Sequence, residues 1–80
     1  MSDNKHLQAA KEAVQQKDMI KALVEATKAI ETEPDCYEAY IIRGQISMMF
    51  GDKNGAAEDM CRALEIKPEL QSQLTGSFNN

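Results

Sequence analysis

The side chains that most often carry out chemistry in proteins are few in this chain of 80 residues. It has two cysteines, Cys36 and Cys61, and a single histidine, His6. The cysteines are too few and too far apart for a disulfide framework, and neither belongs to a Cys-x-x-Cys pair or a Cys/His metal cluster. Free cysteine usually packs as a small hydrophobe, and His6 has no partner visible in the sequence. We therefore expect two plain thiols and a histidine with a surface or packing role.

Two further stretches have the residue types of ligand sites. The segment 51–55, Gly-Asp-Lys-Asn-Gly, lacks the alternating oxygen ligands and terminal glutamate of a calcium-binding loop, so we interpret it as a turn between helices. A run of acidic residues is interpreted as a solvated face; it consists of Glu31, Glu33, Asp35 and Glu38. The sequence shows no nucleophile paired with a base and no glycine-rich phosphate loop. We therefore expect no enzymatic activity, no catalytic residue, no metal and no cofactor.

The composition indicates which partners are compatible with the chain. It is 42% hydrophobic and 28% charged, which is typical of a folded domain. Nine basic residues against thirteen acidic ones give a net charge of -4, which would repel a phosphate backbone. No apolar run approaches the roughly 18 residues that span a bilayer, and the N-terminus lacks a signal-peptide pattern. We expect a cytoplasmic protein whose partner is a protein or peptide, with no nucleic acid and no membrane.

The sequence repeats itself with a period of 34 residues, which is typical of proteins built from helical repeats. The shift superimposes five identical pairs: Asp18 on Asp52, Ala22 on Ala56, Ala29 on Ala63, Glu31 on Glu65 and Pro34 on Pro68. Within each period, small and apolar residues recur at spacings of three or four, the pattern of one buried helical face. The first period has Leu7, Ala10, Val14, Leu23, Ala26 and Ile30, and the second has Tyr40, Gly44, Ser47, Ala56, Met60 and Ala63. Each period therefore predicts two helices.

The expected helix boundaries are marked twice, in register. The pairs 17–18 and 51–52 end in aspartate, which caps a following helix, and Gly51 can adopt the left-handed conformation that ends the preceding one. Pro34 and Pro68 follow the second helix of each period, and a proline disfavours helical conformation in the residue before it. The short linker 33–35 leaves no room for a crossover, so the second hairpin must stack directly on the first.

A helical pair of 34 residues that ends in proline resembles the tetratricopeptide repeat (TPR). Tyr40 stands at the opening aromatic position, Gly44 at the close-contact glycine, and Met60 at the later aromatic position. The pattern departs from the family at Arg43, which replaces a leucine, at Ser47, which replaces a tyrosine, and in the first repeat at His6 and Ala13, where aromatics are expected. The resemblance covers about residues 3–70.

The resemblance implies an all-α fold made of two antiparallel helix-turn-helix repeats, an α-solenoid fragment with a short C-terminal capping helix. The first repeat would span 3–36 and the second 37–70. Residues 71–80 would form the capping helix and tail, and the recurrence of Leu70, Leu74 and Phe78 predicts the helix itself over 69–75. Arrays of this kind usually need three or more repeats. Self-association, a bound partner or further repeats would have to supply the remaining stability.

Proteins similar to this line a concave groove with the first helix of each repeat. Carried over, the groove positions are Asn4, Leu7, Lys11, Val14, Gln15, Glu38, Ile41, Gln45, Met48 and Met49. A subset of the family binds a C-terminal carboxylate with lysine and asparagines, but Leu7, Lys11 and Ile42 stand where three of these residues would be. A carboxylate clamp of that kind is therefore not expected.

The apolar members of this set suit an amphipathic helix laid in the groove, because methionine side chains repack around different partners. The first hypothesis is thus a scaffold that binds a partner helix or peptide, in which Met48→Glu abolishes binding and preserves helicity. The alternatives are a homodimer that buries the same apolar stripe, a fragment of a longer TPR scaffold, and a seat for a neighbouring helix of the same chain at Met48, Met49 and Phe50.

Overall fold

The computed structural model describes residues 4–72, and within them the chain folds into four helices. These are α1 (Lys5–Gln15), α2 (Met19–Thr32), α3 (Tyr37–Met49) and α4 (Lys53–Ile66). Residues 70–72 form one further helical turn, and no β-strand occurs between residues 4 and 72. The prediction of an all-helical chain is confirmed. The helix expected over 69–75 lies only partly within the described residues, which exclude Leu74 and Phe78.

The two interhelical turns are built in the same way, as the sequence predicted. Lys17 and Gly51 have positive φ angles of 64° and 85°, the left-handed conformation that ends a helix. The next residue, Asp18 or Asp52, caps the following helix by accepting a hydrogen bond from the backbone N–H three residues later. Because α4 begins directly after Asp52, most of the segment 51–55 is helical, and the turn is shorter than expected.

Both second helices stop before their proline. In α2 the capping residue is Glu33 and in α4 it is Lys67, and each donates its backbone N–H to the carbonyl four residues earlier. The next residue is Pro34 or Pro68, which lacks an N–H and cannot continue this pattern. The helix ends predicted from the prolines are confirmed.

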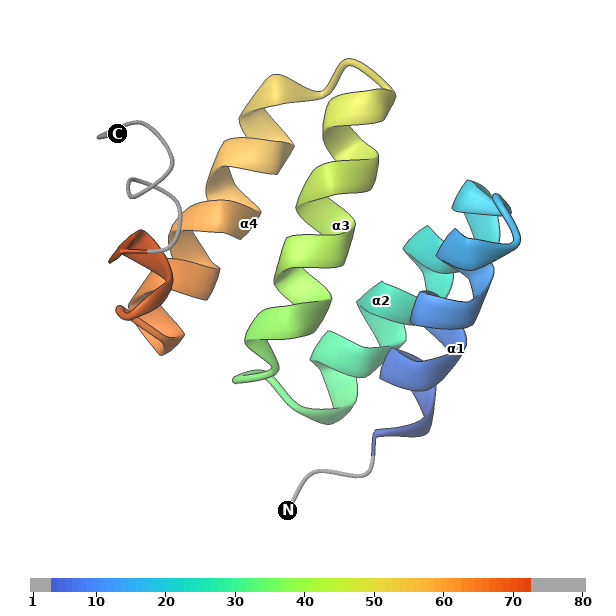
Figure 1. Cartoon of the computed structure of the whole chain (residues 1–80), viewed down its shortest axis with the longest axis horizontal. Helices are drawn as coiled ribbons and strands as arrows, with labels where there is room; N and C mark the ends of the chain where they lie inside the picture. The colour runs from blue at the N-terminus through green and yellow to red at the C-terminus, as the bar shows by residue number, and fades with distance from the viewer. Residues whose placement is uncertain (1–3, 73–80) are drawn as a thin grey trace.

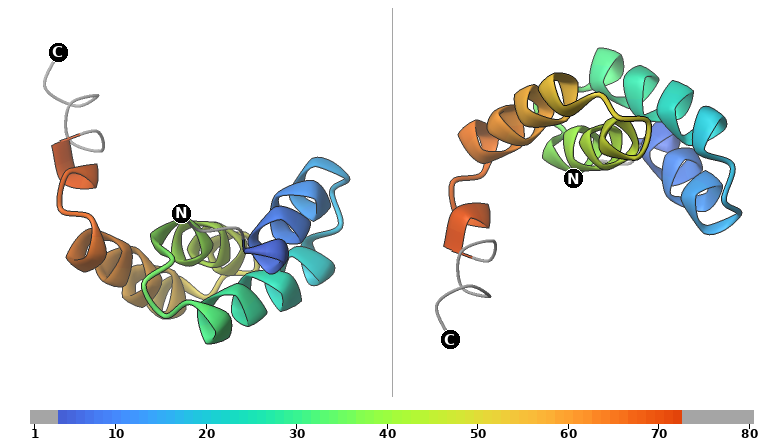
Figure 2. Two further views of the ribbon diagram at one scale, coloured as in Figure 1. Left: turned by 90° about the horizontal axis from the view of Figure 1, so that it is seen from below. Right: turned by 90° about the horizontal axis from the view of Figure 1, so that it is seen from above.

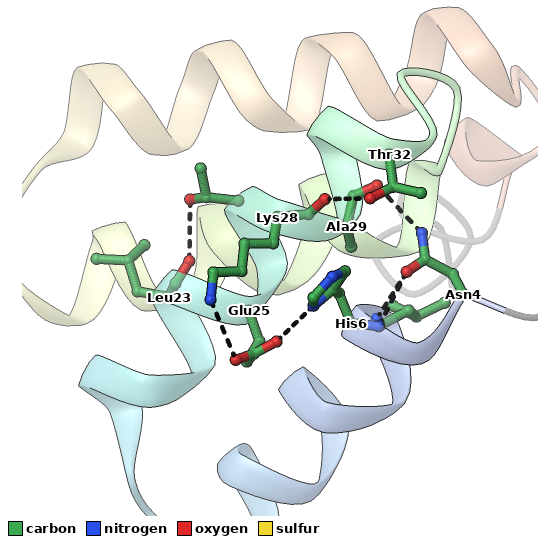
Figure 3. A network of polar contacts seen from close by, with 9 residues as sticks. Asn4, His6, Leu23, Glu25, Lys28, Ala29 and Thr32 are labelled. Atoms are coloured by element: carbon green, nitrogen blue, oxygen red, sulfur yellow. Dashed lines mark hydrogen bonds and ion pairs between the residues drawn. The ribbon is translucent and has the colours of Figure 1, made fainter.

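Asn4 ties the start of α1 to the end of α2 (Figure 3). Its side-chain oxygen accepts hydrogen bonds from the backbone N–H groups of His6 and Leu7. Its Nδ2 donates to the Ala29 carbonyl at 3.1 Å and to Glu33 Oε1 at 3.0 Å. Asn4 itself is only 7% exposed, so these hydrogen bonds satisfy a buried side-chain amide. Asn4 therefore fixes where α1 begins and how it meets α2.

Each helix packs against its neighbours in the chain. Helix α1 packs on α2, α2 on α3 and α3 on α4, with a smaller contact between α1 and α3. Figure 1 shows the two hairpins side by side, and Figure 2 shows the helices following an arc. Helices α1 and α3 lie on the inner side of this arc and α2 and α4 on the outer side (Figure 2). The segment that follows α4 continues the arc at one end.

The core between the helices consists mainly of alanine. Buried alanines occur in all four helices: Ala10, Ala13, Ala22, Ala26, Ala29, Ala39, Ala56 and Ala63. Ile46 is the largest side chain that is fully buried, at 1% exposure. Small side chains let helix axes approach closely, but each contributes little apolar area. The core thus gains stability through close contact of backbones more than through large side chains.

Helices α3 and α4 pack closely against each other, and two features of the sequence lie at their contact. Gly44 is buried, and a Cβ built on it would lie 3.4 Å from both the Ala56 carbonyl and Asp59 Cβ. Nearby, the Arg43 guanidinium pairs with Asp59 through two hydrogen bonds of 2.9 Å. Asp59 raises the pKa of Arg43 through these bonds. The departure from leucine at position 43 therefore supplies a charged link between the two helices.

Candidate functional site

A hollow of about 350 Å³ lies between α1, the start of α3 and the segment that follows α4. Its floor is apolar and is formed by Ile41, Ile42 and Leu70. Polar side chains surround this floor: Lys11, Tyr37, Glu38 and Lys67. In Figure 2, α1 and α3 lie along the inner side of the arc, and residues 70–72 lie at one end of it. We call this hollow the inner groove.

Lys67 and Tyr37 form a contact at the edge of the inner groove. Lys67 Nζ donates a hydrogen bond of 3.0 Å to the Tyr37 hydroxyl oxygen and lies 4.6 Å from the centre of its ring. This hydrogen bond raises the pKa of Lys67, which favours the ammonium form of the side chain. The pair connects the end of α4 with the start of α3. Lys67 is placed by the end of α4 before Pro68, and Tyr37 by the start of α3 after Cys36.

Lys11 and Glu38 link α1 to α3 across the groove. Lys11 Nζ lies 3.2 Å from Glu38 Oε2, and both side chains are more than two fifths exposed. An ion pair with this exposure contributes little to stability. Beyond it lies a second hollow of about 230 Å³, which shares Lys11, Tyr37 and Glu38 with the inner groove. Its other lining residues include Asn4, Leu7, Glu33 and Asp35.

The ten residues predicted for the groove divide into three groups. Lys11, Glu38 and Ile41 line the inner groove. Asn4 and Leu7 line the second hollow but are 7% and 6% exposed, so their side chains are mainly committed to the helix cap and to the core. The remaining five are exposed on α1 and α3 toward the interhelical turns: Val14, Gln15, Gln45, Met48 and Met49.

The sequence analysis did not assign Tyr37, Ile42, Lys67 or Leu70 to the groove. Helix α3 begins at Tyr37, two residues earlier than a 34-residue shift of Lys5 would place it. Tyr37 is therefore on the helix and near Lys67, a residue 30 positions away. Pro68 could have indicated that α4 ends at Lys67. No nearby residue in the sequence indicates that Tyr37 is the partner of Lys67.

Two further titratable groups that do not line the inner groove, Glu25 and Cys36, have structural contacts. His6 Nδ1 lies 2.8 Å from Glu25 Oε1, a pairing of α1 with α2 that is visible in Figure 3. The hydrogen bond from His6 lowers the pKa of Glu25, with a smaller contribution from Lys28. Burial raises the pKa of Cys36, which packs with Leu7, Ala29 and Ala39. Cys36 and Cys61 are both free thiols, as predicted.

No three His, Cys, Asp or Glu side chains among residues 4–72 gather closely enough to hold a metal ion. None of the helices in this range has the length and apolar character needed to cross a membrane. Comparison of the chain with protein-family models, with curated proteins and with solved structures found no match.

Proposed function

We propose that this chain is a protein-interaction module of two TPR-like repeats that binds a partner helix or peptide in the inner groove. The observation that carries the proposal is the hollow lined by apolar Ile41, Ile42 and Leu70 together with four polar side chains. A concave, apolar surface with a few convergent polar groups is the usual form of a binding site.

The repeat assignment is supported by local geometry that recurs at the sequence period. Helices α2 and α4 begin and end 34 residues apart. The backbone N–H of Asp18 donates to the Ala13 carbonyl at 2.8 Å, and that of Asp52 donates to the Ser47 carbonyl at the same distance. The alternation of inner and outer helices in Figure 2 also suits stacked helical hairpins.

The test uses a set of fluorescent, amphipathic 15-residue peptides that carry one stripe of leucines, with binding measured by anisotropy. The variant Ile41→Asp places a charge on the apolar floor and should weaken binding at least about tenfold. Ile20→Asp is the matched control, because Ile20 is 67% exposed on α2, on the outer side of the arc. Circular dichroism checks that both variants remain helical. Binding that survives Ile41→Asp, or that falls equally in both variants, would contradict the proposal.

Self-association is a second candidate, favoured by one observation. Met48, Met49 and Phe50 are consecutive and are 54%, 63% and 55% exposed. Apolar side chains grouped in this way can mark a contact surface. In a homodimer, this patch and the exposed Val14 would be covered by a second copy. Met48→Glu distinguishes the two candidates. Because Met48 does not line the inner groove, we no longer expect this substitution to abolish peptide binding. It should dissociate a homodimer and affect peptide binding less than Ile41→Asp.

A further inference from the structure

The contact between Lys67 and Tyr37 leaves hydrogen-bond donors unused. The Tyr37 hydroxyl oxygen accepts one hydrogen bond from Lys67 Nζ. Because that oxygen is accepting from an ammonium, its own O–H must point to another group. The ammonium also has three N–H donors, of which this contact occupies one. Both side chains line the inner groove, so these donors are available to an acceptor that enters it.

The charge at this place favours an anionic acceptor. Lys11, the other lysine of the inner groove, has Glu38 at 3.2 Å. Lys67 takes part in none of the ion pairs formed among residues 4–72, and its hydrogen bond is to an uncharged hydroxyl. Glu69 and Glu38 are near enough to contribute to the raised pKa of Lys67, but neither forms an ion pair with it, so the cation has no anion in direct contact. A charged acceptor makes stronger hydrogen bonds with such donors than a neutral one.

The form of the site indicates which anion fits. The apolar floor beside the pair includes Ile41 and Leu70. Tyr37 lines both hollows, so a bound segment has a depression on either side of this position and can continue past it. An acidic side chain within a segment suits this arrangement better than the carboxylate at a chain end. A free phosphate or other small anion would leave the apolar floor uncovered.

We propose that Lys67 and Tyr37 bind the carboxylate of an aspartate or glutamate side chain within a partner segment, whose apolar residues pack on Ile41 and Leu70. This inference rests on the proposed function, in which the inner groove binds a polypeptide. It adds the chemistry of the partner: an amphipathic segment with an acidic residue next to its apolar stripe.

The experiment uses leucine-striped 15-residue peptides that differ only at one central position, which is Glu, Gln or Lys. Anisotropy should show that the Glu peptide binds the unmodified chain about fivefold more tightly than the Gln peptide, the upper range for a solvent-exposed ion pair. The Lys peptide should bind most weakly. The preference for Glu should decrease as salt is added, because exposed charges are screened.

Three variants identify the residues responsible. Lys67→Met should remove the preference for Glu, so that the Glu and Gln peptides bind equally. The variant should keep the end of α4, because the helix cap at this residue is made by its backbone N–H. Tyr37→Phe should remove part of the preference, since it deletes only the hydroxyl. Lys53→Met is the matched control, because it removes the same charge from an exposed position at the start of α4. It should preserve the fivefold preference.

The outcomes separate this inference from the proposed function. If Glu and Gln peptides bind equally, or if Lys67→Met keeps the preference for Glu, the carboxylate site is wrong and the groove remains a binding surface. If peptide binding also survives Ile41→Asp, the proposed function is wrong as well. Absence of binding by every peptide would overturn both.

Discussion

At the scale of single residues, the contact between Arg43 and Asp59 combines two opposing effects. Its two hydrogen bonds of 2.9 Å have the geometry of a strong bidentate pair. Its side chains are only 27% and 10% exposed, so both charges have lost much of their hydration. Such a pair adds little net stability compared with apolar residues, but the loss of one partner leaves a charge without compensation.

We therefore expect Arg43→Met to reduce the free energy of unfolding by about 2 kcal/mol, because the Asp59 carboxylate remains buried without its partner. A domain of this size has a total of only about 3 to 5 kcal/mol. The double variant Arg43→Met/Asp59→Ala should be more stable than Arg43→Met alone, since no buried charge remains. Urea unfolding followed by circular dichroism measures both. If the double variant loses the sum of the two single losses, the residues are not coupled.

Glu25 makes stability depend on pH in the acidic range. His6 lowers the pKa of Glu25 below its ordinary value of 4.5, so folding favours the ionised carboxylate. The resulting stabilisation is present above about pH 4.5 and is lost as the pH falls through the lower pKa of the folded state.

The urea midpoint of the unmodified chain should consequently decrease between pH 5 and pH 3, and Glu25→Gln should weaken this dependence. Glu31→Gln serves as the control, because it removes an exposed carboxylate from the same helix. Equal acid dependence in the unmodified chain and in Glu25→Gln would show that the contact with His6 does not stabilise the fold.

At the scale of elements, the two interhelical turns place a lysine and a glycine in the same left-handed backbone conformation. Gly51 adopts φ 85° without cost, whereas Lys17 adopts φ 64° with a side chain that disfavours it. No atom lies within 4 Å of a Cβ built on Gly51, so the conformation alone decides the effect of a substitution there. The two turns thus provide a matched pair of positions in one protein.

Lys17→Gly should stabilise the chain by about 0.5 to 1 kcal/mol, and Gly51→Ala should destabilise it by about 1 kcal/mol. Both changes leave the following aspartate cap intact. Thermal unfolding followed by circular dichroism measures whether each substitution raises or lowers the stability. If Lys17→Gly is destabilising, the side chain of Lys17 has a favourable contact that outweighs the strain of its backbone.

The turns and helix ends could be predicted from the sequence because their causes are local. Gly51, Asp52 and Pro68 each act within a few residues of where they stand. The groove was harder to predict, because the Tyr37–Lys67 contact joins residues 30 positions apart and α3 starts earlier than the repeat indicated. The family register also selected positions by spacing alone, and it therefore included residues that lie in the core or near the turns.

The buried faces show the same limit at the level of side chains. The spacing pattern identified Leu7, Ala10 and Gly44, all of which are buried. It also included Val14, which is 36% exposed, and it omitted Ile46, the largest fully buried side chain. The spacing of apolar residues locates the buried face of a helix only to within about one residue. Which neighbour becomes buried depends on how closely the facing helix approaches, and alanine-rich contacts bring it very close.

At the scale of the whole molecule, the exposed patch of Met48, Met49 and Phe50 is compatible with either binding to a partner or self-association. A stable interface buries about 800 Å² on each partner, more than three half-exposed side chains supply. Two copies with a net charge of -4 each also repel one another. Both arguments favour a single chain in solution.

We accordingly expect light scattering after size-exclusion chromatography to give the mass of one chain, 8.9 kDa, across a dilution series that brackets micromolar protein. The thermal midpoint should then be independent of concentration, because no association is coupled to folding. A mass of two chains that falls on dilution would instead favour the homodimer, and Phe50→Asp should then restore one chain by placing a charge in the patch. If the mass remains two in that variant, another surface makes the contact, and the inner groove becomes the next one to test with Ile41→Asp.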